Sequence, residues 1–556
     1  MKYSGAEIII KLLEKQGINI IAGIPGGANL PLYNALYKSK IRHILVRHEQ
    51  SAGFIAQGIA RSTGKPAVCF ATSGPGVTNL LTAIADAKLD SIPIIAITGQ
   101  VATSLIGTDA FQEVDTYGMT IPITKHNFLV KNARELLSII PEAFHIATSR
   151  RPGPVLIDVP KDVQSQFIEF DAWPKKIKPR KKHAINMKAI KKISQMLNHS
   201  KKPLMYIGGG IISSGAEDFV CKLARKNSIP VVSTLMALGA FSADEPLYLG
   251  MLGMHAAMST NFIIEEADLV LAFGTRFDDR ATGHAEKFCR NAKIVHIDID
   301  DAEIDKIKKT NFSICADISQ ALKALIPFVR KDKRQRWILE INEQKKKYPI
   351  CLAENNPMHP RSVIKAISEL TSPDTIITTD VGQHQMWVAQ NYPFKKPRTL
   401  LTSGGLGTMG FGLPAAIGAA LVNPNKKILC ISGDGSILMN IQEFATLAEL
   451  NLNVTIIIMN NGYLGLVRQQ QEFFYEKKYI ASRFLARHSF KKIAQGFGLK
   501  AFELNSGGKV CSVLAKALSD CGPNLIDINI HHAHNVIPMV VPGRPNTEMT
   551  RGGIHE

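Results

Sequence analysis

No stretch of this sequence stays apolar over the roughly 18–20 residues that crossing a membrane takes. Residues 8–14 interrupt their apolar side chains with Lys11 and Glu14, as one face of an amphipathic helix does. They do not resemble the apolar core of a secretory signal. We therefore expect a cytoplasmic protein that has no membrane partner.

Common nucleotide-binding signatures are missing as well. The chain has no Gly-x-x-x-x-Gly-Lys segment, which excludes a P-loop. Gly208-Gly209-Gly210 is followed by Ser213 where a dinucleotide fingerprint has glycine. No repeat of about 20–50 residues is visible, which argues against a solenoid. The residues by themselves give no reason to expect NAD.

Paired cysteines are absent too. The eight cysteines are scattered and form no Cys-x-x-Cys. Most stand in apolar surroundings, as Cys430 does, which predicts buried free thiols in a reducing cytosol rather than disulfides or metal ligands.

Acidic residues are too few to balance the basic ones, and the formal net charge is +19. Two short segments, 174–183 and 330–347, supply +6 and +5 of it. Apart from Trp337, neither has aromatic residues on which bases could stack, and neither resembles a nucleic-acid module. We interpret both segments as solvated linkers between domains and expect no nucleic-acid partner.

A chain of 556 residues is too long for one core. Short β-branched and apolar runs alternate with helix-length segments, in three groups that the two basic segments separate. Such runs predict an α/β fold of three doubly wound parallel-sheet domains. The runs are 41–46, 67–72, 92–98 and 155–159; 203–208, 230–234, 267–274 and 293–298; and 375–380, 427–433, 454–460 and 524–530.

The domain boundaries follow from this grouping. We place the first domain at 1–170, a basic linker at 171–187, the central domain at 188–329, a charged linker at 330–357, the third domain at 358–545 and a tail at 546–556. The tail is either a flexible cap over the site or a frayed terminus. One sequence leaves open whether the first and third domains are distant structural repeats.

One pair of loops carries the strongest chemical signal. The strand 427–433 leads into Gly433-Asp434-Gly435-Ser436, and the strand 454–460 leads into Asn461. A right-handed β-α-β unit places both carboxyl ends over one crevice, so Asp434 and Asn461 can converge on a cation. Glycines let the backbone approach phosphate closely, and carboxylate and amide oxygens suit Mg²⁺ bridged to a diphosphate. The pair is typical of thiamine-diphosphate enzymes.

A second candidate follows the strand 41–46, at Arg47-His48-Glu49-Gln50. Thiamine diphosphate has to lose a proton from its thiazolium ring, and a shielded carboxylate bonded to the pyrimidine ring favours that loss. Glu49 opens the small-residue helix 52–61, where a ring could approach closely. Taken alone, Glu49 is more simply a carboxylate that stabilises a helix N-terminus. With the loop pair present, we interpret it as the activating group.

These residues and their neighbours resemble the catalytic subunit of acetohydroxyacid synthase (acetolactate synthase), over nearly the whole chain. RFDDRATG at 276–283 and GTDAFQE at 107–113 are specific to the biosynthetic synthases. The other blocks are GIPGGA at 23–28, RHEQ at 47–50, ATSGPGVTN at 71–79, RPGPVLIDVPK at 151–161, GMH at 253–255 and SGGLGTMGFGL at 403–413.

The resemblance implies that pyruvate is decarboxylated and its two-carbon unit is joined to a second 2-oxo acid, pyruvate or 2-oxobutyrate, in branched-chain amino-acid biosynthesis. It also implies the cofactors thiamine diphosphate, Mg²⁺ and FAD, a homodimer or higher oligomer, and a small regulatory subunit. In these terms Glu49 activates the cofactor, while Mg²⁺ is held by Asp434, Asn461 and the backbone oxygen of Tyr463.

The other implied residues fall into four groups. The first domain of a partner subunit contributes Gly27, Phe111, Gln112 and Lys161. Thiamine diphosphate is shaped and held by Gly382, Gln383, His384, Gly407, Met409, Gly433, Gly435 and Ser436. FAD is bound by Arg151, Gly208, Gly209, Gly210, Gly274, Arg276 and Asp298. The acceptor meets Met254 and, through its carboxylate, Arg280; a surface ion pair of Arg280 with Asp278 or Asp279 is the alternative.

The sequence departs from many synthases after the Asn-Asn loop. Gln470 stands where the family usually has Trp, and Leu466 where it has Met. That Trp favours 2-oxobutyrate through its extra methyl group, and one methylene in an apolar pocket is worth about 1–3 kcal/mol. We therefore expect little preference between the two acceptors. The stretch 465–471 and the tail 538–549 resemble the type I bacterial isozyme, which shares this Gln.

Several alternatives remain at this point. Pyruvate oxidase shares fold and cofactors, although RFDDRATG argues against it. Catabolic acetolactate synthase also has Gln near position 470 but lacks the FAD features, and glyoxylate carboligase lacks the glutamate. His531-His532-Ala533-His534 has no acidic partner in sequence, so we expect solvated imidazoles rather than a metal cluster.

Overall fold

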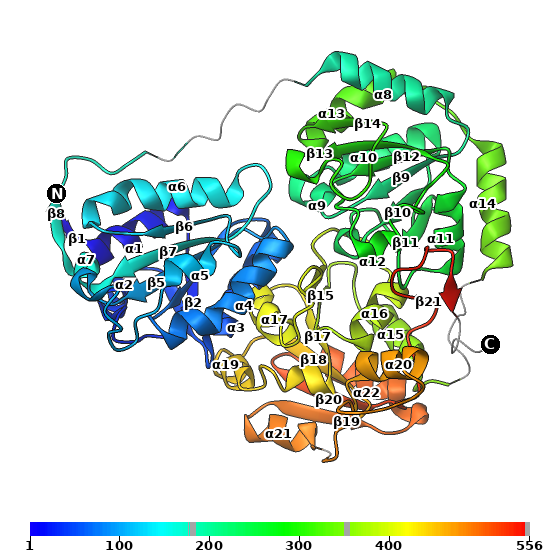
Figure 1. Cartoon of the computed structure of the whole chain (residues 1–556). Coiled ribbons are helices and arrows are strands. Elements are labelled where there is room, and N and C mark those ends of the chain that lie inside the picture. The colour runs from blue at the N-terminus through cyan, green and yellow to red at the C-terminus, as the bar shows by residue number, and fades with distance from the viewer. Residues whose placement is uncertain (176, 178–184, 350–355, 487, 551–556) are drawn as a thin grey trace.

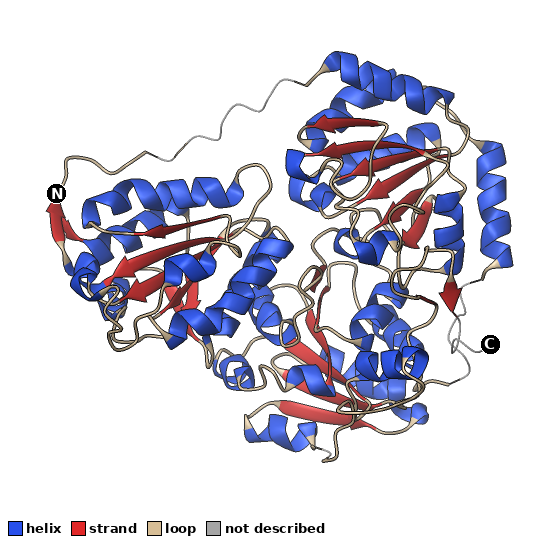
Figure 2. Cartoon of the chain, viewed as in Figure 1, coloured by secondary structure: helices blue, strands red, loops and turns tan. Residues whose placement is uncertain are grey.

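The computed structural model describes residues 1–175, 177, 185–349, 356–486 and 488–550. Within them lie three six-stranded sheets whose neighbouring strands run parallel, with helices packed around each sheet (Figures 1 and 2). The α/β fold of three doubly wound domains is thereby confirmed. The boundaries assigned above stay a prediction.

The first sheet has the strand order β3-β2-β4-β5-β7-β6. Helices α1 (Gly5–Gln16) and α6 (Leu136–Thr148) pack together on one face, and α3 (Glu49–Thr63) and α4 (Pro75–Leu89) pack together on the other. The strands are β2 Ile20–Gly23, β3 Arg42–Leu45, β4 Ala67–Ala71, β5 Ile94–Gln100, β6 His126–Leu129 and β7 Val155–Pro160.

The third sheet follows the same path as the first. Its order is β16-β15-β17-β18-β20-β19, so both sheets read second, first, third, fourth, sixth, fifth in chain order. The structure thus gives the two domains one topology, a relation that the sequence left open. The strands are β15 Ile376–Thr379, β16 Leu400–Thr402, β17 Ile428–Gly433, β18 Val454–Asn460, β19 Lys500–Leu504 and β20 Asn524–Asn529.

The central sheet has a different order, β11-β10-β9-β12-β13-β14. In chain order this reads third, second, first, fourth, fifth, sixth, the order of dinucleotide-binding domains, whose ligand lies where the order reverses. That point falls between β9 and β12. The strands are β9 Pro203–Ile207, β10 Val231–Ser233, β11 Tyr248–Met251, β12 Leu269–Phe273, β13 Lys293–Asp298 and β14 Phe312–Cys315.

The first and third domains share one core, at the crossing of α3 with α17 (Gly412–Val422). A Cβ on Gly58 would strike the carbonyl of Ala415, and one on Gly418 would strike the carbonyl of Ile55. The two contacts mirror each other, since each glycine stands three residues after the carbonyl that meets the opposite glycine. Only glycine lets the two backbones approach this closely.

The charged segment 330–357 is more than a solvated linker, because it contains the helix α14 (Gln335–Lys347). Trp337 and Ile341 are buried in the core of the central domain, and the Trp337 indole donates to the carbonyl of Pro203 at 3.1 Å. The apolar residues among the lysines thus form one buried face. Most of the basic run 174–183, like residues 350–355, lies outside the described residues.

Two further expectations need correction. Cys69, Cys289 and Cys430 are buried free thiols and Cys221 is half-buried, but Cys315, Cys511 and Cys521 are exposed. The tail is not frayed as far as residue 550, because β22 (Met549–Thr550) pairs with β21 (Met539–Val540) and Asn546 is buried. Among the described residues, no helix combines the length and apolar character that crossing a membrane requires.

Candidate functional site

The carboxyl ends of β17 and β18 bring the two predicted loops into direct contact. Gly433 pairs in register with Met459, and the chain then turns into the short helix α18 (Asp434–Ile437). Asp434 Oδ2 accepts a hydrogen bond from the backbone N–H of Gly462 at 2.9 Å. Asp434 therefore lies against the Asn-Asn-Gly turn, as the β-α-β geometry predicts.

This corner of the site suits a divalent cation. Asp434 is buried, and burial raises its pKa to about 7. A nearby cation would offset that loss of solvation and keep the carboxylate charged. Asn461 and Tyr463 lie in the same turn, where the backbone N–H of Tyr463 donates to Asn461 Oδ1 at 2.9 Å. One carboxylate with amide and carbonyl oxygens is a donor set that fits Mg²⁺ held with a diphosphate.

His384 supplies a second feature that fits a diphosphate. It is the second residue of α16 (Gln383–Asn391), its ring is buried, and Nε2 has no hydrogen-bond partner. Burial lowers its pKa to about 3, so the ring is neutral. A Cβ on Gly382 or on Gly433 would press on this imidazole, so both positions need glycine's lack of a side chain. Buried polar atoms normally have partners, and a bound polar group would satisfy Nε2.

The remaining residues of this group lie around the same sheet edge. Ser436 Oγ donates to the carbonyl of Val381 at 3.0 Å, which ties the two turns together. A Cβ on Gly435 would meet the side chains of Leu464 and Phe484. Gly407 is exposed with φ 72°, and Met409 is half-buried two residues further along.

Sequence reasoning missed Asp380, which follows β15. Its carboxylate accepts from the backbone N–H of Gly412 at 2.7 Å and from Ser432 Oγ at 2.5 Å. The side chain is fully buried, and burial raises its pKa. Asp380 thus ties the start of α17 to β17, just before Asp434. The feature of the sequence that could have identified Asp380 is its place at the end of a run of buried strand residues.

Glu49 is the first residue of α3, on the first domain. His48 caps the helix, since its ring accepts from the backbone N–H of Gln50. The Glu49 carboxylate accepts from Asn79 Nδ2 at 2.9 Å, and a Cβ on Gly76 would lie 3.6 Å from its other oxygen. Glu49 is half-buried, so one side of it remains accessible.

The other first-domain candidates are largely on the surface. Phe111 is 89% exposed, and Gly27 and Lys161 are exposed. Gln112 has φ 62° and packs on Gly74, where a Cβ would meet its backbone. Within one chain these residues face no wall of the central cavity described below.

Glu113, which sequence reasoning did not assign a role, fixes the loop that carries Phe111 and Gln112. Its carboxylate accepts from the backbone N–H groups of Gly107, Thr108 and Ala110, the last two at 3.1 and 3.2 Å. These hydrogen bonds lower the pKa of Glu113, and the one from Gly107 has the largest effect. Several backbone N–H groups converging on one anion form a nest, which here holds the loop in shape without substrate.

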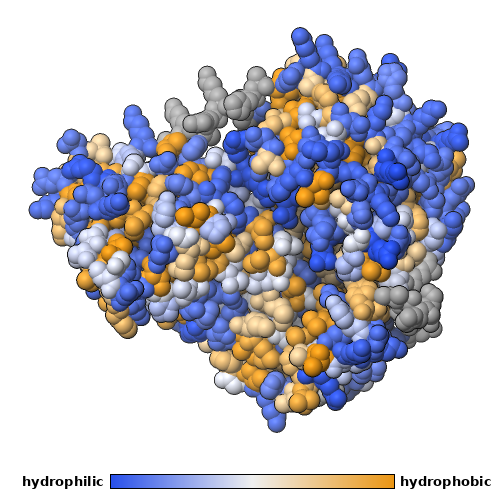
Figure 3. Space-filling model, in the orientation of Figure 1, coloured by the Kyte–Doolittle hydropathy of each residue, from blue (hydrophilic) through white to orange (hydrophobic). Residues whose placement is uncertain are grey.

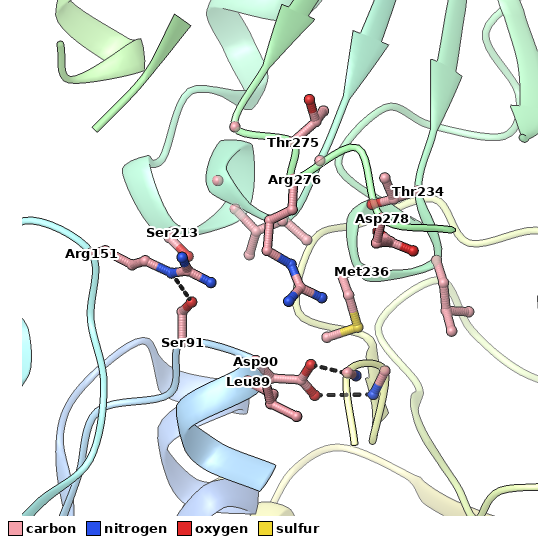
Figure 4. A pocket seen from close by; sticks show the side chains of 18 of the residues that line it. Leu89, Asp90, Ser91, Arg151, Ser213, Thr234, Met236, Thr275, Arg276 and Asp278 are labelled. Atoms are coloured by element: carbon pink, nitrogen blue, oxygen red, sulfur yellow. Dashed lines mark hydrogen bonds between the residues drawn. The ribbon is translucent and has the colours of Figure 1, made fainter. Parts of the chain in front are cut away.

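A cavity of about 1340 Å³ opens between the three domains and gathers most of the other predicted residues (Figure 4). It does not include Glu49, Asp434 or Asn461. The cavity therefore joins the residues predicted to bind FAD and the acceptor with the loop at Gly407, while the predicted metal corner lies outside it. Its predicted lining residues are Arg151, Gly208, Gly209, Gly210, Met254, Gly274, Arg276, Arg280, Asp298, Gly407 and Gln470.

The central-domain wall of this cavity fits a large polar cofactor such as FAD. At the reversal of strand order, a Cβ on Gly208 or Gly210 would strike Gly274, so only glycines allow these turns to touch. The hydroxyls of Thr234 and Thr275 line the cavity, buried and without a partner. Unsatisfied hydroxyls at a topological switch point suit a ligand with many polar groups.

Arg151 enters the cavity from the first domain, at the left of Figure 4, and Arg276 enters it from the central domain above. Arg151 is bound by Ser91 Oγ at 2.8 Å and forms ion pairs with Asp300 at 3.2 Å and Glu303 at 2.6 Å. It therefore also joins the first domain to the central one. Arg276 extends from the loop after β12 toward the space between the domains.

Met254 and Arg280, which are predicted to meet the acceptor, lie on two turns that bond to each other. The backbone N–H of Met254 donates to the carbonyl of Arg280 at 2.8 Å, and a Cβ on Gly253 would strike that carbonyl. The Arg280 guanidinium contacts Met254 Sδ at 3.6 Å and Asp279 at 3.6 Å. Arg280 and Asp279 are both largely exposed, and an ion pair between exposed side chains is weak. The guanidinium is therefore free to bind a carboxylate.

The C-terminal segment holds these turns in place. The backbone N–H of Val540 donates to the carbonyl of Met254 at 2.8 Å, and Asn546 Nδ2 donates to the carbonyl of Ala281 at 2.8 Å. The histidines before this segment are not simply solvated: the His532 ring stacks on Tyr463 at 5.1 Å, and His534 packs edge-on against His359 at 4.5 Å.

A buried charge network, also absent from the sequence reasoning, anchors the glycine loop 403–408. Arg61 forms ion pairs with Asp86 at 3.1 Å and Asp90 at 2.8 Å. Asp90 accepts from the backbone N–H groups of Gly404 and Gly405 at 3.0 and 2.8 Å, and Asp86 accepts from Ser403 Oγ. Figure 4 shows the Asp90 contacts at the floor of the cavity. The first domain thus positions a third-domain loop of the same chain.

Comparisons with known proteins agree with this geometry. Models of thiamine pyrophosphate enzymes match residues 3–119 (N-terminal TPP binding domain), 190–325 (central domain) and 380–528 (C-terminal TPP binding domain). Each match lies on one of the three sheets.

Full-length relatives carry a more specific name. The chain is 53% identical over 550 residues to the acetolactate synthase isozyme 1 large subunit of Escherichia coli (strain K12), covering 99% of this chain and 98% of the relative. It is 42% identical over 549 residues to the isozyme 2 large subunit of that organism, with 98% and 99% covered. It is 44% identical over 560 residues to the chloroplastic acetolactate synthase 1 of Nicotiana tabacum, with 97% and 83% covered. The type I resemblance is thereby confirmed, and the chain belongs to the acetolactate synthase large-subunit family of thiamine pyrophosphate enzymes.

Proposed function

We propose that this acetolactate synthase completes its reaction site from two copies of the chain, with the first domain of one copy facing the third domain of the other. The family's activity is decarboxylation of pyruvate and condensation with pyruvate or 2-oxobutyrate, in branched-chain amino-acid biosynthesis. The observation that carries the proposal is the contact of Asp434 with the Asn461-Gly462 turn, which builds the predicted metal corner from the third domain alone.

The surface of the chain supports a two-copy site. Exposed large apolar side chains occur in the first-domain segment 105–121 and in the third-domain segment 467–485. In Figure 3 hydrophobic patches are frequent over the first and third domains, while hydrophilic residues dominate over the central one. Exposed apolar patches mark interaction surfaces, and a symmetric pair would cover both segments. A homodimer is therefore the smallest assembly we propose.

Each residue group has a task in this arrangement. Thiamine diphosphate, when bound, supplies the electron sink for decarboxylation and carbon–carbon bond formation. Asp434, Asn461 and the Tyr463 carbonyl would hold Mg²⁺ against its diphosphate, and His384 would contact the diphosphate. Glu49 would hold a hydrogen bond to the pyrimidine ring. Its accessible side and its bond to Asn79 leave one carboxylate oxygen for that contact.

The substrates would be bound from two sides. Gly27, Phe111, Gln112 and Lys161 would cover the reacting carbon from the partner copy and exclude water. Arg280 would bind the carboxylate of the acceptor through its planar fork, and Met254 would pack against the acceptor's apolar end. Gln470 lines the cavity beside Leu466, without the indole that would favour 2-oxobutyrate, so we propose little preference between acceptors.

Two further parts of the proposal concern the cell. We propose that the chain binds a small regulatory subunit, because several relatives carry the words "large subunit" in their names. We also propose that it works in the cytoplasm, whose reducing conditions suit free thiols such as Cys69 and Cys430. Pyruvate oxidase and catabolic acetolactate synthase are not favoured, given the identity over the full length to the biosynthetic isozymes.

Product analysis tests the proposed function. Purified protein with pyruvate alone should yield 2-acetolactate, and added 2-oxobutyrate at equal concentration should yield similar amounts of 2-aceto-2-hydroxybutyrate. Omitting Mg²⁺ or thiamine diphosphate should abolish both products, and the protein should carry bound FAD. Oxygen consumption matching pyruvate loss would indicate an oxidase instead, and strong excess of one product would refute the proposed lack of acceptor preference.

A further inference from the structure

Gln469 is a fully buried side chain on α20 (Gly465–Phe474), the helix that follows the Asn461 turn. All of its hydrogen-bonding capacity is used within the chain. Its amide forms hydrogen bonds with both backbone groups of Val536. Nε2 donates to the Val536 carbonyl at 2.9 Å, and Oε1 accepts from the Val536 N–H at 2.7 Å. Nε2 also contacts Met539 Sδ at 3.4 Å.

The same oxygen of Gln469 connects to the metal corner. Gln383 Nε2 donates to Gln469 Oε1 at 2.9 Å and to the carbonyl of His534 at 3.1 Å. These bonds fix the Gln383 amide so that its oxygen faces Asn461, whose Nδ2 donates to it at 3.3 Å. A Cβ on Gly465 would strike both Gln383 Oε1 and Asn461 Nδ2, so glycine there keeps the contact open.

We propose that Gln469 is a positioning residue for the metal site: acting through Gln383, it holds the Asn461 side chain with its oxygen turned toward Mg²⁺. The inference rests on the proposed function, in which Asn461 is a ligand. An amide presents either oxygen or nitrogen to a cation, and only the oxygen binds. With Nδ2 committed to Gln383, the oxygen, which also accepts from the Tyr463 N–H, is the end that can face the ion.

The network reaches the acceptor pocket as well. Val536 lies four residues before Val540, whose N–H supports the carbonyl of Met254. One side chain therefore connects the turn that holds the metal with the segment that holds the acceptor residue. Loss of a residue that hydrogen-bonds to a metal ligand typically lowers metal affinity or activity by about 10–100-fold.

A simpler role for Gln469 is packing alone. In that role, a buried glutamine whose hydrogen bonds are satisfied stabilises the third domain. Its removal would then lower the stability of the domain without changing its affinity for metal. The two roles differ in one measurable respect: a positioning residue acts through Gln383, whereas a packing residue does not.

The experiment is a double-mutant cycle on Mg²⁺ binding. Gln469→Met, Gln383→Met and the double variant keep the approximate volume of each side chain. With thiamine diphosphate present, tryptophan fluorescence gives the Mg²⁺ concentration at half-saturation, and electron paramagnetic resonance counts bound Mn²⁺. We expect each single variant to raise half-saturation by about 10-fold or more, and the double variant to add little beyond Gln383→Met.

Leu514→Ala is the matched control. It opens a cavity in the core of the same domain, on α22 (Val510–Ser519), which contributes no residue to the site. It should lower the melting temperature and leave Mg²⁺ half-saturation unchanged. Should Gln469→Met fail to fold, Gln383→Met with normal half-saturation would overturn the inference by itself.

Two results would overturn the inference: normal Mg²⁺ half-saturation in a folded Gln469→Met protein, or effects of the two single variants that simply add. Failure of the proposed function looks different. In that case Asp434→Asn and Asn461→Ala would also leave metal binding unchanged.

Discussion

The third-domain and first-domain halves of the proposed site are built on the same strand order, yet only the third-domain half is already formed within one chain. The third-domain half is preformed: Asp434 and His384 are buried, Asp434 is bonded to the Gly462 N–H, and Asn461 is bonded to Gln383. The first-domain half is open, with Phe111 89% exposed and Lys161 on the surface. A shared topology places loops at the same sheet edge, but burial decides which loops are complete in one chain.

The largest expected effect comes from separating the two halves. Glu49→Gln and Asp434→Asn should each be inactive: loss of a proton-handling group costs about 10²–10⁴-fold, and loss of the metal carboxylate removes cofactor binding. Mixing the two inactive chains and allowing subunits to exchange should restore about a quarter of wild-type activity, because about half the dimers are mixed and each has one intact site. Acetolactate formation measures this. No recovery despite proven exchange would place both halves in one chain.

The next largest effect concerns the joint between the halves. Arg61→Ala removes the cation that pairs with both Asp86 and Asp90, and breaking such a buried pair costs about 3–5 kcal/mol. Urea unfolding should report this loss of unfolding free energy. Asp301→Ala is the control, because its ion pair with Arg150 is exposed and such pairs contribute about 0–1 kcal/mol. Equal effects of the two variants would show that the joint does not depend on this network.

A smaller effect is expected at the open half. Glu113→Gln removes the anion from the nest of N–H groups, so the loop with Phe111 and Gln112 should loosen. We expect kcat/KM to fall roughly 10-fold, in the range that misplaced groups cost, with faster hydrogen exchange at 107–110. The exposed Glu142→Gln should change neither. Unchanged exchange in Glu113→Gln would show that the loop needs no such anchor.

The same anchor predicts a pH dependence. Hydrogen bonds from the backbone lower the pKa of Glu113, so the folded loop favours the ionised form. Its contribution is present above the ordinary carboxyl pKa and is lost as pH falls through the lowered value. In the wild-type protein, amide hydrogen exchange at residues 107–110 should therefore stay slow through the mildly acidic pH range. In the Glu113→Gln variant, exchange at these residues should be fast throughout that range.

The smallest effect lies in the acceptor pocket, at the edge of the preformed half. Gln470→Trp should raise the preference for 2-oxobutyrate over pyruvate by roughly 10-fold, since an indole can contact the extra methyl group. Competition between the acceptors measures the ratio. Gln495→Trp, at an exposed position of α21 (Phe490–Gly496), should leave this ratio unchanged. No change with Gln470→Trp would mean that the acceptor does not reach this side chain.

The sequence pattern found most of the fold. Within the three six-stranded sheets, every strand that it missed apart from β2 is at a sheet edge: β6, β11, β14, β16 and β19. Edge strands are covered less completely, so their residues form shorter and less apolar runs than the central strands do. Helix α14 was misread as a linker because its lysines hide the spacing of Trp337 and Ile341.

The candidate site divides in the same way. Asp434 and Asn461 could be paired from sequence because local β-α-β geometry brings them together. Gln469 and Gln383 could not, because they meet only where α20 packs against α16 and the C-terminal segment. Arg61 and Ser403 lie more than three hundred residues apart in the chain, and no local rule connects them.

By itself the sequence determined the fold class, the family and the chemistry of the loops, because strand periodicity and glycine-rich turns are properties of short segments. Tertiary structure alone decided which half of the proposed site is preformed, which side chains hold the Asn461 turn, and that the glycine loop 403–408 is fixed from the first domain. Those features depend on burial and on contacts between distant segments, and both arise only when the helices and sheets have packed together.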